Sequence, residues 1–191
     1  QDSILPIVDK QSGQLTHNDL TISLSDEKAL TMEQGLADTL DSSSAVHSWG
    51  AFYTKSTTLY NEEGGSADVS IVGAEDDARM TEYFTFRTRV GHDPIPFEED
   101  SVILTEKTAL NLELSVGDTF YVEAADGSRV PLVLTGITEN YMFTRLYLSG
   151  AQLESLLGGT PEWNTVYGLT GCTTEAEYNA LRTKLLGCNY V

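Results

Sequence analysis

The chain has 191 residues, of which 40% are hydrophobic and 21% charged, so it can fold as one large domain or two small ones around a hydrophobic core. Acidic residues outnumber basic ones by 29 to 11, which gives a net charge of −18. This balance excludes nucleic-acid binding and docking on an anionic membrane surface, because both need clustered Lys and Arg. The acidity is typical of a protein that stays soluble.

Strands are predicted wherever β-branched and aromatic residues gather in a run. In chain order the predicted strands are 19–25, 46–60, 67–74, 101–105, 118–124, 130–138, 145–149, 163–171 and a short run at 188–191. Asp126 and Gly127 lie between two of these runs and predict a hairpin turn at 125–128, in which Gly supplies the positive φ.

Helix starts are marked by capping boxes, in which a hydroxyl residue is followed three positions later by Glu or Gln. The boxes are Thr31 with Gln34, Ser149 with Gln152, and Thr174 with Glu177. The last two helices are predicted to end at glycines, namely Gly158 and Gly187. A fourth, shorter helix is predicted after Thr105, and the acidic residues 75–77 suit a further helix N-terminus.

Both ends of the chain alternate strand, capped helix and strand. Two such units are each too small to bury a sheet face, so we predict that they combine into one split βαβ–βαβ layer. The fold class is therefore α+β, with a discontinuous subdomain of residues 18–60 and 161–191 and an inserted, mixed β-rich subdomain of residues 61–160. The turn-rich segments 61–66 and 158–162 are the candidate hinges.

Signals for catalysis or metal binding are weak throughout. His17, His47 and His92 lack metal-ligand spacing, and the acidic groups 75–77 and 98–100 lack the ligand pattern of a calcium loop. Ser25 and Lys28 match S-x-x-K, but the companion motifs of that serine acyl-enzyme family are absent. Nucleotide-binding glycine motifs are absent as well. We expect no enzyme activity, no cofactor and no metal.

Aromatic residues are the candidates for partner binding. Alternation along 46–60 places Trp49 and Tyr53 on one strand face and Phe52 on the other, and a second group contains Tyr141 and Phe143. These rings either form core and sheet surface or contribute to a contact patch, since Tyr and Trp are favoured at interfaces. We name Trp49, Tyr53, Tyr141 and Phe143 as possible partner-binding residues.

The sequence was also searched for membrane or signal segments and for a disulfide. No apolar run reaches the roughly 20 residues of a membrane helix, and the first residues resemble neither a signal peptide nor a natural start. We expect the chain to be cut from a longer gene. Cys172 and Cys188 are too few for a disulfide scaffold, and a helix between them disfavours their pairing without excluding it.

The stretch 101–159 contains an ordered series of short motifs. These are an apolar strand at 102–105, a leucine-rich approach to Val116-Gly117-Asp118, Gly136-Ile137, Glu139-Asn140-Tyr141, an aromatic strand at 146–149 and the helix beginning near Gln152. In this order they resemble the large extracytoplasmic domain of FtsX/MacB-type ABC transporter permeases. The strong match covers about 100–160, and a looser one extends to most of the chain.

The resemblance implies a domain outside the membrane, between the first and second transmembrane helices of a cell-membrane permease. It implies a porter-like βαβ–βαβ subdomain with an insertion, a separate cytoplasmic ATPase and a permease dimer. The cargo would be an unknown peptide, lipid or cell-wall protein, and no catalytic residue is implied for this domain.

Two alternatives stay open at this point. The same β-rich elements would suit a free-standing extracellular binding or adhesion domain. A hydrolase with a site around Ser25 and Lys28 is the other possibility.

Overall fold

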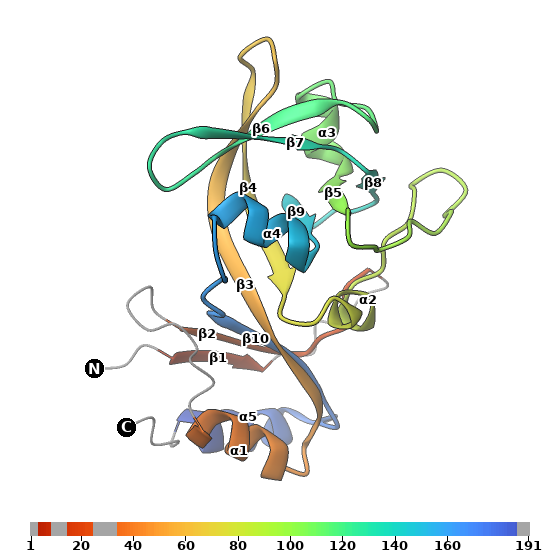
Figure 1. Ribbon diagram of the computed structural model, residues 1–191. Coiled ribbons are helices and arrows are strands. Elements are labelled where there is room, and N and C mark those ends of the chain that lie inside the picture. Colours follow the sequence, from red (N-terminus) through yellow and green to blue (C-terminus); the bar gives the residue numbers. More distant parts are fainter. Residues whose placement is uncertain (1–3, 9–14, 25–33, 187–191) are drawn as a thin grey trace.

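The computed structural model describes residues 4–8, 15–24 and 34–186 and shows a mixed α/β protein built on one large sheet (Figure 1). The sheet has 10 strands, of which eight follow the order β1-β2-β10-β3-β4-β9-β5-β8, while β6 pairs with β3 and β7. The strands are β1 (Ile4–Val8), β2 (Leu20–Leu24), β3 (Val46–Tyr60), β4 (Ser66–Ala74), β5 (Val102–Thr105), β6 (Thr119–Glu123), β7 (Arg129–Val133), β8 (Gly136–Thr138), β9 (Arg145–Leu148) and β10 (Thr165–Thr170).

Within the described residues, five helices lie against this sheet, namely α1 (Gln34–Ser42), α2 (Ala78–Tyr83), α3 (Glu106–Asn111), α4 (Gly150–Leu157) and α5 (Glu175–Leu186). The capping chemistry predicted from the sequence is confirmed where it is described. Ser149 Oγ accepts a hydrogen bond from Gln152 N at the start of α4, and Gly158 ends that helix with a φ of 73°. At the start of α5, Thr174 Oγ1 accepts from Glu177 N and donates to its carboxylate.

The long strand β3 runs through the whole molecule, and its residues belong to separate hydrophobic clusters (Figure 1). Because side chains alternate along a strand, Ala51 and Tyr53 face one side of the sheet and Phe52 the other. Ala51 packs in a cluster with α1 and α5, whereas Tyr53 packs in a second cluster with residues of α3 and α4. Phe52 belongs to the third cluster, on the opposite face beneath α2 and residues 84–86.

At the end of the molecule that carries α1 and α5, the strand order is β1-β2-β10-β3 and every pairing is antiparallel. The chain passes from β2 through α1 to β3, two strands that both flank β10. Strand β1 pairs with β2 from Ile4↔Leu24 to Val8↔Leu20 and was not predicted from the sequence. The strand was missed because Pro6 argues against a strand at this place, although β1 is an edge strand, where proline is tolerated.

The other end of the sheet is mixed. Strand β4 pairs in parallel with β9, and β5 in parallel with β8, while β5 and β9 are antiparallel. The single strand predicted at 130–138 is wrong: the chain forms β7, which pairs with β6, and then β8, which pairs with β5. The switch falls at Leu134 and Thr135, where Thr135 N donates to Val102 O and its hydroxyl accepts from Val102 N.

Hydrogen bonds close both the turn between β6 and β7, which the sequence predicted, and the turn between β3 and β4. In the β6–β7 turn, Asp126 Oδ1 accepts from Ser128 N and Oγ, and Gly127 has a φ of 84°. In the β3–β4 turn, Asn61 Oδ1 accepts from Glu63 N and Gly65 N. Residues 61–65, proposed from the sequence as part of a hinge, therefore form a tight hairpin turn.

Some predictions lie outside the described residues. These are the strand at 188–191 with Cys188, the cap at Thr31, the helix end at Gly187, and the Ser25–Lys28 pair. The division into residues 18–60 with 161–191 and an insertion of 61–160 stays a prediction. Among the described residues, no helix combines the length and apolar character needed to cross a bilayer.

Candidate protein-contact site

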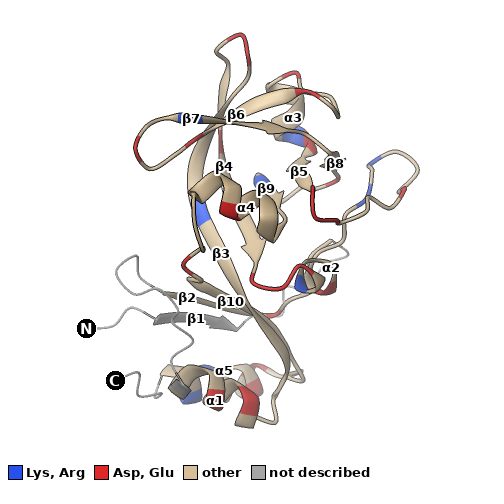
Figure 2. Cartoon of the chain, viewed as in Figure 1, with Lys and Arg blue, Asp and Glu red and all other residues tan. Residues whose placement is uncertain are grey.

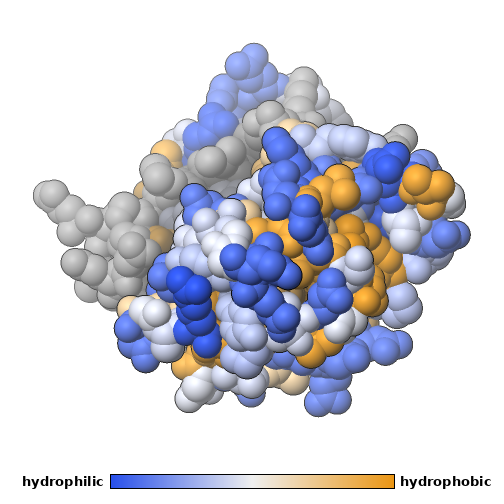
Figure 3. All heavy atoms as spheres, turned by 90° about the horizontal axis from the view of Figure 1, so that it is seen from above, coloured by the Kyte–Doolittle hydropathy of each residue, from blue (hydrophilic) through white to orange (hydrophobic). Residues whose placement is uncertain are grey.

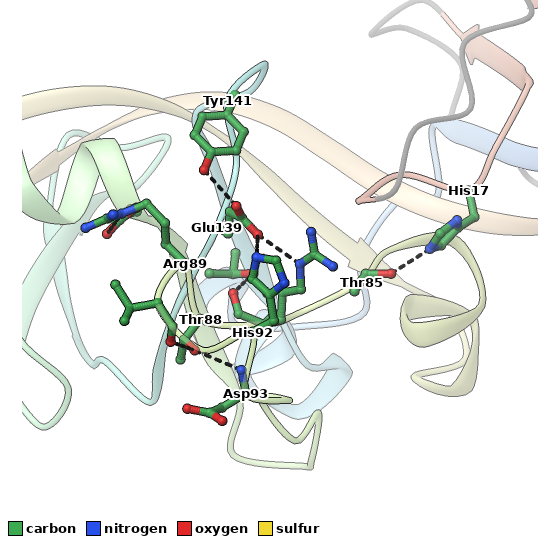
Figure 4. Close-up of polar contacts among 12 residues, drawn as sticks. His17, Thr85, Thr88, Arg89, His92, Asp93, Glu139 and Tyr141 are labelled. Carbon is green, nitrogen blue, oxygen red and sulfur yellow. Dashed lines mark hydrogen bonds and ion pairs between the residues drawn. The ribbon is translucent and has the colours of Figure 1, made fainter.

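Glu139 is the centre of a polar cluster that joins two loops (Figure 4). Its side chain is 6% exposed and accepts a hydrogen bond from Arg87 Nε at 2.8 Å and from the Tyr141 hydroxyl at 2.7 Å. His92 Nε2 lies 3.6 Å from the same carboxylate. Backbone bonds add to this contact, since Glu139 N donates to Arg87 O. The Glu139 carboxylate therefore fixes the loop that carries Tyr141 to the loop of residues 87–94.

The loop of residues 87–94 is braced from several sides. Thr88 N donates to Asp93 O, and the Thr88 hydroxyl donates to Val90 O while accepting from Asp93 N. Arg89 Nε donates to both carboxylate oxygens of Glu106 on α3, at 3.0 and 2.9 Å. These bonds hold Val90 at the loop tip with 72% of its surface exposed.

Asn140 shapes the loop that follows Glu139. Its Oδ1 accepts from Met142 N at 2.9 Å and from Phe143 N at 2.8 Å, which is the local bonding by which Asn closes a turn. The turn leaves Tyr141 and Met142 with 74% and 72% of their surface exposed. The Glu-Asn-Tyr motif thus has one residue that anchors, one that shapes the loop and one that presents a ring.

Charge and hydrogen bonding act together on this cluster. The hydrogen bond from Tyr141, followed by the bond and charge of Arg87, lowers the pKa of Glu139, against the opposing effect of desolvation. The same hydrogen bond raises the pKa of Tyr141, because the carboxylate stabilises the protonated phenol. Both shifts favour a charged Glu139 and a neutral Tyr141 near neutral pH.

Exposed large hydrophobic side chains concentrate at the end of the molecule opposite α1 and α5 (Figure 1). Among the described residues they include Val90, Leu110, Val116, Val133, Tyr141 and Met142, all of which lie between α2 and β9 in the chain. Figure 3, which looks onto this end, shows hydrophobic patches between hydrophilic side chains. Exposed apolar and aromatic residues on braced loops are typical of protein-contact surfaces.

The four partner-binding candidates from the sequence fall into different environments. Tyr141 is exposed, and the half-buried ring of Phe143 lies 3.8 Å from the Arg145 guanidinium carbon. Tyr53 is only 7% exposed and packs in the core, so it offers a partner almost no surface. Trp49 lies on the same face of β3 but at its other end, so the structure does not bring the four together.

Trp49 borders a cleft of about 610 Å³ between the α1–β3 connection and the start of α2. Its indole N–H donates to Asp41 Oδ1 at 2.8 Å, and Glu75, Asp76 and Arg79 line the opposite side. Acidic residues are numerous at both ends of the molecule, as Figure 2 shows. Binding of a partner by Trp49, Tyr141 or Phe143 stays a prediction.

Two of the acidic residues 75–77, Asp76 and Asp77, have structural roles. Asp76 Oδ1 accepts from Ala78 N at the start of α2, whereas Asp77 Oδ1 accepts from Gly150 N at the start of α4. Within residues 4–8, 15–24 and 34–186, no three His, Cys, Asp or Glu side chains gather in a way that could hold a metal ion. His17 Nε2 is hydrogen-bonded to the Thr85 hydroxyl, away from His92 (Figure 4).

The sequence named Tyr141 as a candidate for partner binding but gave no sign that Glu139 anchors it. Glu139 and Arg87 are 52 residues apart, and neither spacing nor composition signals such a pair. The one available signal was the Glu-Asn-Tyr order itself, which the structure explains through the roles of its three side chains.

Two similar solved structures are an extracellular domain and a periplasmic region of other proteins. The extracellular domain of the ABC-type transporter YknZ from Gram-positive bacteria is 18% identical over 92% of this chain and 94% of that domain, with a TM-score of 0.49. The periplasmic region of MacB from Actinobacillus actinomycetemcomitans is 15% identical over 79% of this chain and 71% of that region, with a TM-score of 0.46. No protein-family model matches the sequence, and a search of curated proteins found no match either.

Proposed function

We propose that the chain is the extracytoplasmic domain of an FtsX/MacB-like ABC transporter permease and has no catalytic activity of its own. In this role it contacts other proteins outside the cell membrane. It passes on conformational changes that a cytoplasmic ATPase drives through the rest of the permease.

The observation that carries the proposal is the order of the motifs between residues 101 and 159. Each motif occupies its own element: the apolar strand is β5, Val116-Gly117-Asp118 is the turn before β6, Gly136-Ile137 begins β8, and the last motif is α4. Glu139-Asn140-Tyr141 is the loop that fixes residues 87–94. The motifs that carry the resemblance are thus consecutive parts of one folded unit.

A porter-like βαβ–βαβ subdomain with an insertion is part of the proposal. The order β2-β10-β3, with α1 and α5 packed on the same cluster, supports it. In this reading residues 18–60 and 161–191 form the terminal subdomain, and residues 61–160 form the insertion. The exposed loops around Val90 and Tyr141 then lie in the insertion, where a peptide, lipid or cell-wall protein cargo, or a second permease subunit, could make contact.

The proposal is tested first by the complete gene. We expect an apolar segment just before Gln1, three more after Val191 and a Walker-type ATPase encoded nearby. Polar, globular sequence on both sides of the chain would contradict the proposal. A signal peptide or a single anchor would instead support the free-standing extracellular binding domain.

Function is tested in the full-length permease, reconstituted with its ATPase in lipid discs. We expect Tyr141→Ser combined with Met142→Ser to weaken the ATPase response to the extracellular partner without changing basal hydrolysis. Leu157→Ser is the matched control, because Leu157 is an exposed apolar residue at the end of α4, outside both loops. An unchanged response in the double variant would remove these loops from the proposal.

A further inference from the structure

Strand β3 continues past the end of β4, as Figure 1 shows. Strand β4 pairs with β3 only as far as Phe52↔Ala74, whereas β10 pairs with it as far as Thr170↔Val46. After β4 the chain turns away into α2. Residues 46–50 are therefore paired on the side of β10, and on the opposite side no strand of the described residues pairs with them. We call this opposite side the open β3 edge.

Hydrogen bonds on both sides of β3 show which backbone groups point to the open β3 edge. Glu75 N donates to Ala51 O on the side of β4, and Asn164 N donates to Phe52 O on the side of β10. Successive residues of a strand direct their N–H and C=O groups to alternate sides, so the next residue that faces the open β3 edge is Trp49. Among the described residues, no loop and no side chain bonds to the Trp49 backbone. Its N–H and C=O are therefore available to a further strand.

The cleft of about 610 Å³ leaves room for an extended segment along this edge. Its lining includes the backbone stretch from Val46 to Ala51, with Leu40 and Asp41 at the end of α1 on one side and the start of α2 on the other. The wall on the side of α2 is close to the strand, since a Cβ atom at Gly50 would lie 3.2 Å from Arg79 Cγ. The open β3 edge thus forms the floor of a slot between two helix ends.

The charges along the cleft favour a basic partner. Asp41, Glu75 and Asp76 contribute three carboxylates to the lining, while the guanidinium of Arg79 is paired with Glu82 at 2.8 Å. In the described part of the chain, no three such groups gather closely enough to hold a metal ion, so the carboxylates are spread along the cleft. The net charge of −18 disfavours pairing with a second copy of this chain, but it attracts a segment that carries Lys or Arg.

We propose that the open β3 edge binds an extended, Lys- or Arg-bearing segment of a partner protein, which adds a strand in line with β4. The Trp49 backbone supplies the main-chain hydrogen bonds, while its indole is held aside by the bond to Asp41 Oδ1. Alternate side chains of the added strand point to opposite faces, so one set approaches Asp41 and the other the start of α2. The open edge is short, and the carboxylates therefore add both affinity and selectivity.

The test adds capped peptides of stated composition to the whole chain and follows the Trp49 amide by nuclear magnetic resonance. We expect a peptide of alternating lysine and valine to slow hydrogen exchange of this amide, and a peptide of alternating glutamate and valine to have no effect. The lysine–valine peptide methylated at every backbone nitrogen keeps its charges but has no donors for a strand. We expect it to bind at least about tenfold more weakly, because its main-chain hydrogen bonds are lost.

A charge reversal in the lining tests the choice of a basic partner. We expect Glu75→Lys to weaken binding of the lysine–valine peptide about fivefold at low salt, since an attraction between exposed charges becomes a repulsion. Glu62→Lys is the matched control, because it changes the net charge equally but lies in the β3–β4 turn, away from the cleft. It should bind the peptide as the wild type does.

The proposal is wrong if the lysine–valine peptide leaves exchange of the Trp49 amide unchanged, or if the methylated peptide binds as tightly as the parent. Binding to Glu75→Lys at wild-type strength would contradict a basic partner. Dimerisation in analytical ultracentrifugation that protects the same amide would identify a second copy as the occupant and would also contradict the proposal. None of these results bears on the permease assignment, which rests on residues 101–159.

Discussion

Glu139 shows how one carboxylate can determine the form of a surface. Its bonds to Arg87 and Tyr141 hold two loops whose tips, Val90 and Met142, are strongly exposed. An exposed apolar residue contributes to binding only when its backbone is fixed beforehand, because ordering a loop at the moment of binding costs conformational entropy. The buried anchor and the exposed ring therefore belong to one functional unit.

Replacing this anchor by its neutral isostere should lower stability in a pH-dependent way. The folded pKa of Glu139 lies below the ordinary value of 4.5, so its stabilising effect is complete above that value and disappears as the pH falls through the folded pKa. We expect Glu139→Gln to unfold at lower urea concentration than the wild type at pH 7, with the difference shrinking toward pH 3.

Glu62→Gln is the control for this measurement, because Glu62 is exposed in the β3–β4 turn. It should leave the urea midpoint unchanged at either pH. A Glu139→Gln deficit that is as large at pH 3 as at pH 7 would show that the carboxylate charge is not the stabilising feature.

The Asn164 side chain hydrogen-bonds the backbone of β3 just before β10 begins. It accepts a hydrogen bond from Thr54 N at 2.9 Å and donates one to Thr54 O at 2.8 Å, one residue before β10 begins to pair with β3. We expect Asn164→Ala to lower the free energy of unfolding by about 1–3 kcal/mol, because both backbone groups lose their partner. Chemical denaturation measures this loss. Asn164→Asp keeps the acceptor but not the donor, so an unimpaired Asp variant would contradict the role of the amide.

At the scale of elements, α4 is tied to two other parts of the chain through its first turn. Ser149 is fully buried, and its hydroxyl accepts from Gln152 N and donates to Glu99 O. The Asp77 carboxylate accepts from Gly150 N, the next residue. The start of α4 therefore depends on side chains and carbonyls that are distant in sequence.

Removing the Ser149 hydroxyl should destabilise the fold measurably. We expect Ser149→Ala to lower the free energy of unfolding by about 1–2 kcal/mol, since a lost N-cap costs about 1 kcal/mol and the Glu99 carbonyl also loses its donor. Ser155→Ala on the exposed face of the same helix is the control, and it should be neutral or slightly stabilising because Ala favours helix. Equal effects of the two substitutions in urea denaturation would exclude a capping role.

How far the elements could be read from the sequence depends on whether their cause is local. Val46–Tyr60, the cap at Ser149 and the turn at Asp126 follow from side-chain chemistry within a few residues, and all were predicted. The break between β7 and β8 was missed because the composition of 130–138 is strand-like throughout and only the distant partners differ. The burial of Tyr53 was open for the same reason, since alternation assigns a face but not what covers it.

The candidate site was predictable only in part. Tyr141 and Phe143 were named as candidates because aromatic residues stand out in a polar stretch, and their role in binding stays a prediction. Arg87 and His92 were not, because their meeting with Glu139 depends on the path of the chain between α2 and β5.

At the scale of the whole molecule, the sheet runs across the boundary that the sequence predicts between two subdomains. Residues 18–60 and 61–160 were predicted to belong to different subdomains, yet β3 and β4 pair continuously from Phe52↔Ala74 to Tyr60↔Ser66. Trp163 packs against the clusters of both ends. Separating the two ends would require breaking this pairing as well as the packing.

We therefore expect the chain to unfold in one cooperative transition in spite of its length of 191 residues. Tryptophan fluorescence follows Trp49 and Trp163, whereas far-ultraviolet circular dichroism follows all strands and helices. The two signals should give the same urea midpoint. Two separated transitions, with part of the dichroism retained after the fluorescence change, would show that the ends are independently stable units.

The three neighbouring residues Ala51, Phe52 and Tyr53 also determine how the protein tolerates insertions and deletions. Each packs in a different hydrophobic cluster, and the side of the sheet reverses at every step along β3. Losing a single residue from this stretch would turn the remainder of the strand over, exchanging its inward and outward faces along half the molecule. The hairpin tip at 61–65 lies beyond the end of β3, so length changes in the gene should be accepted there and rejected around Phe52.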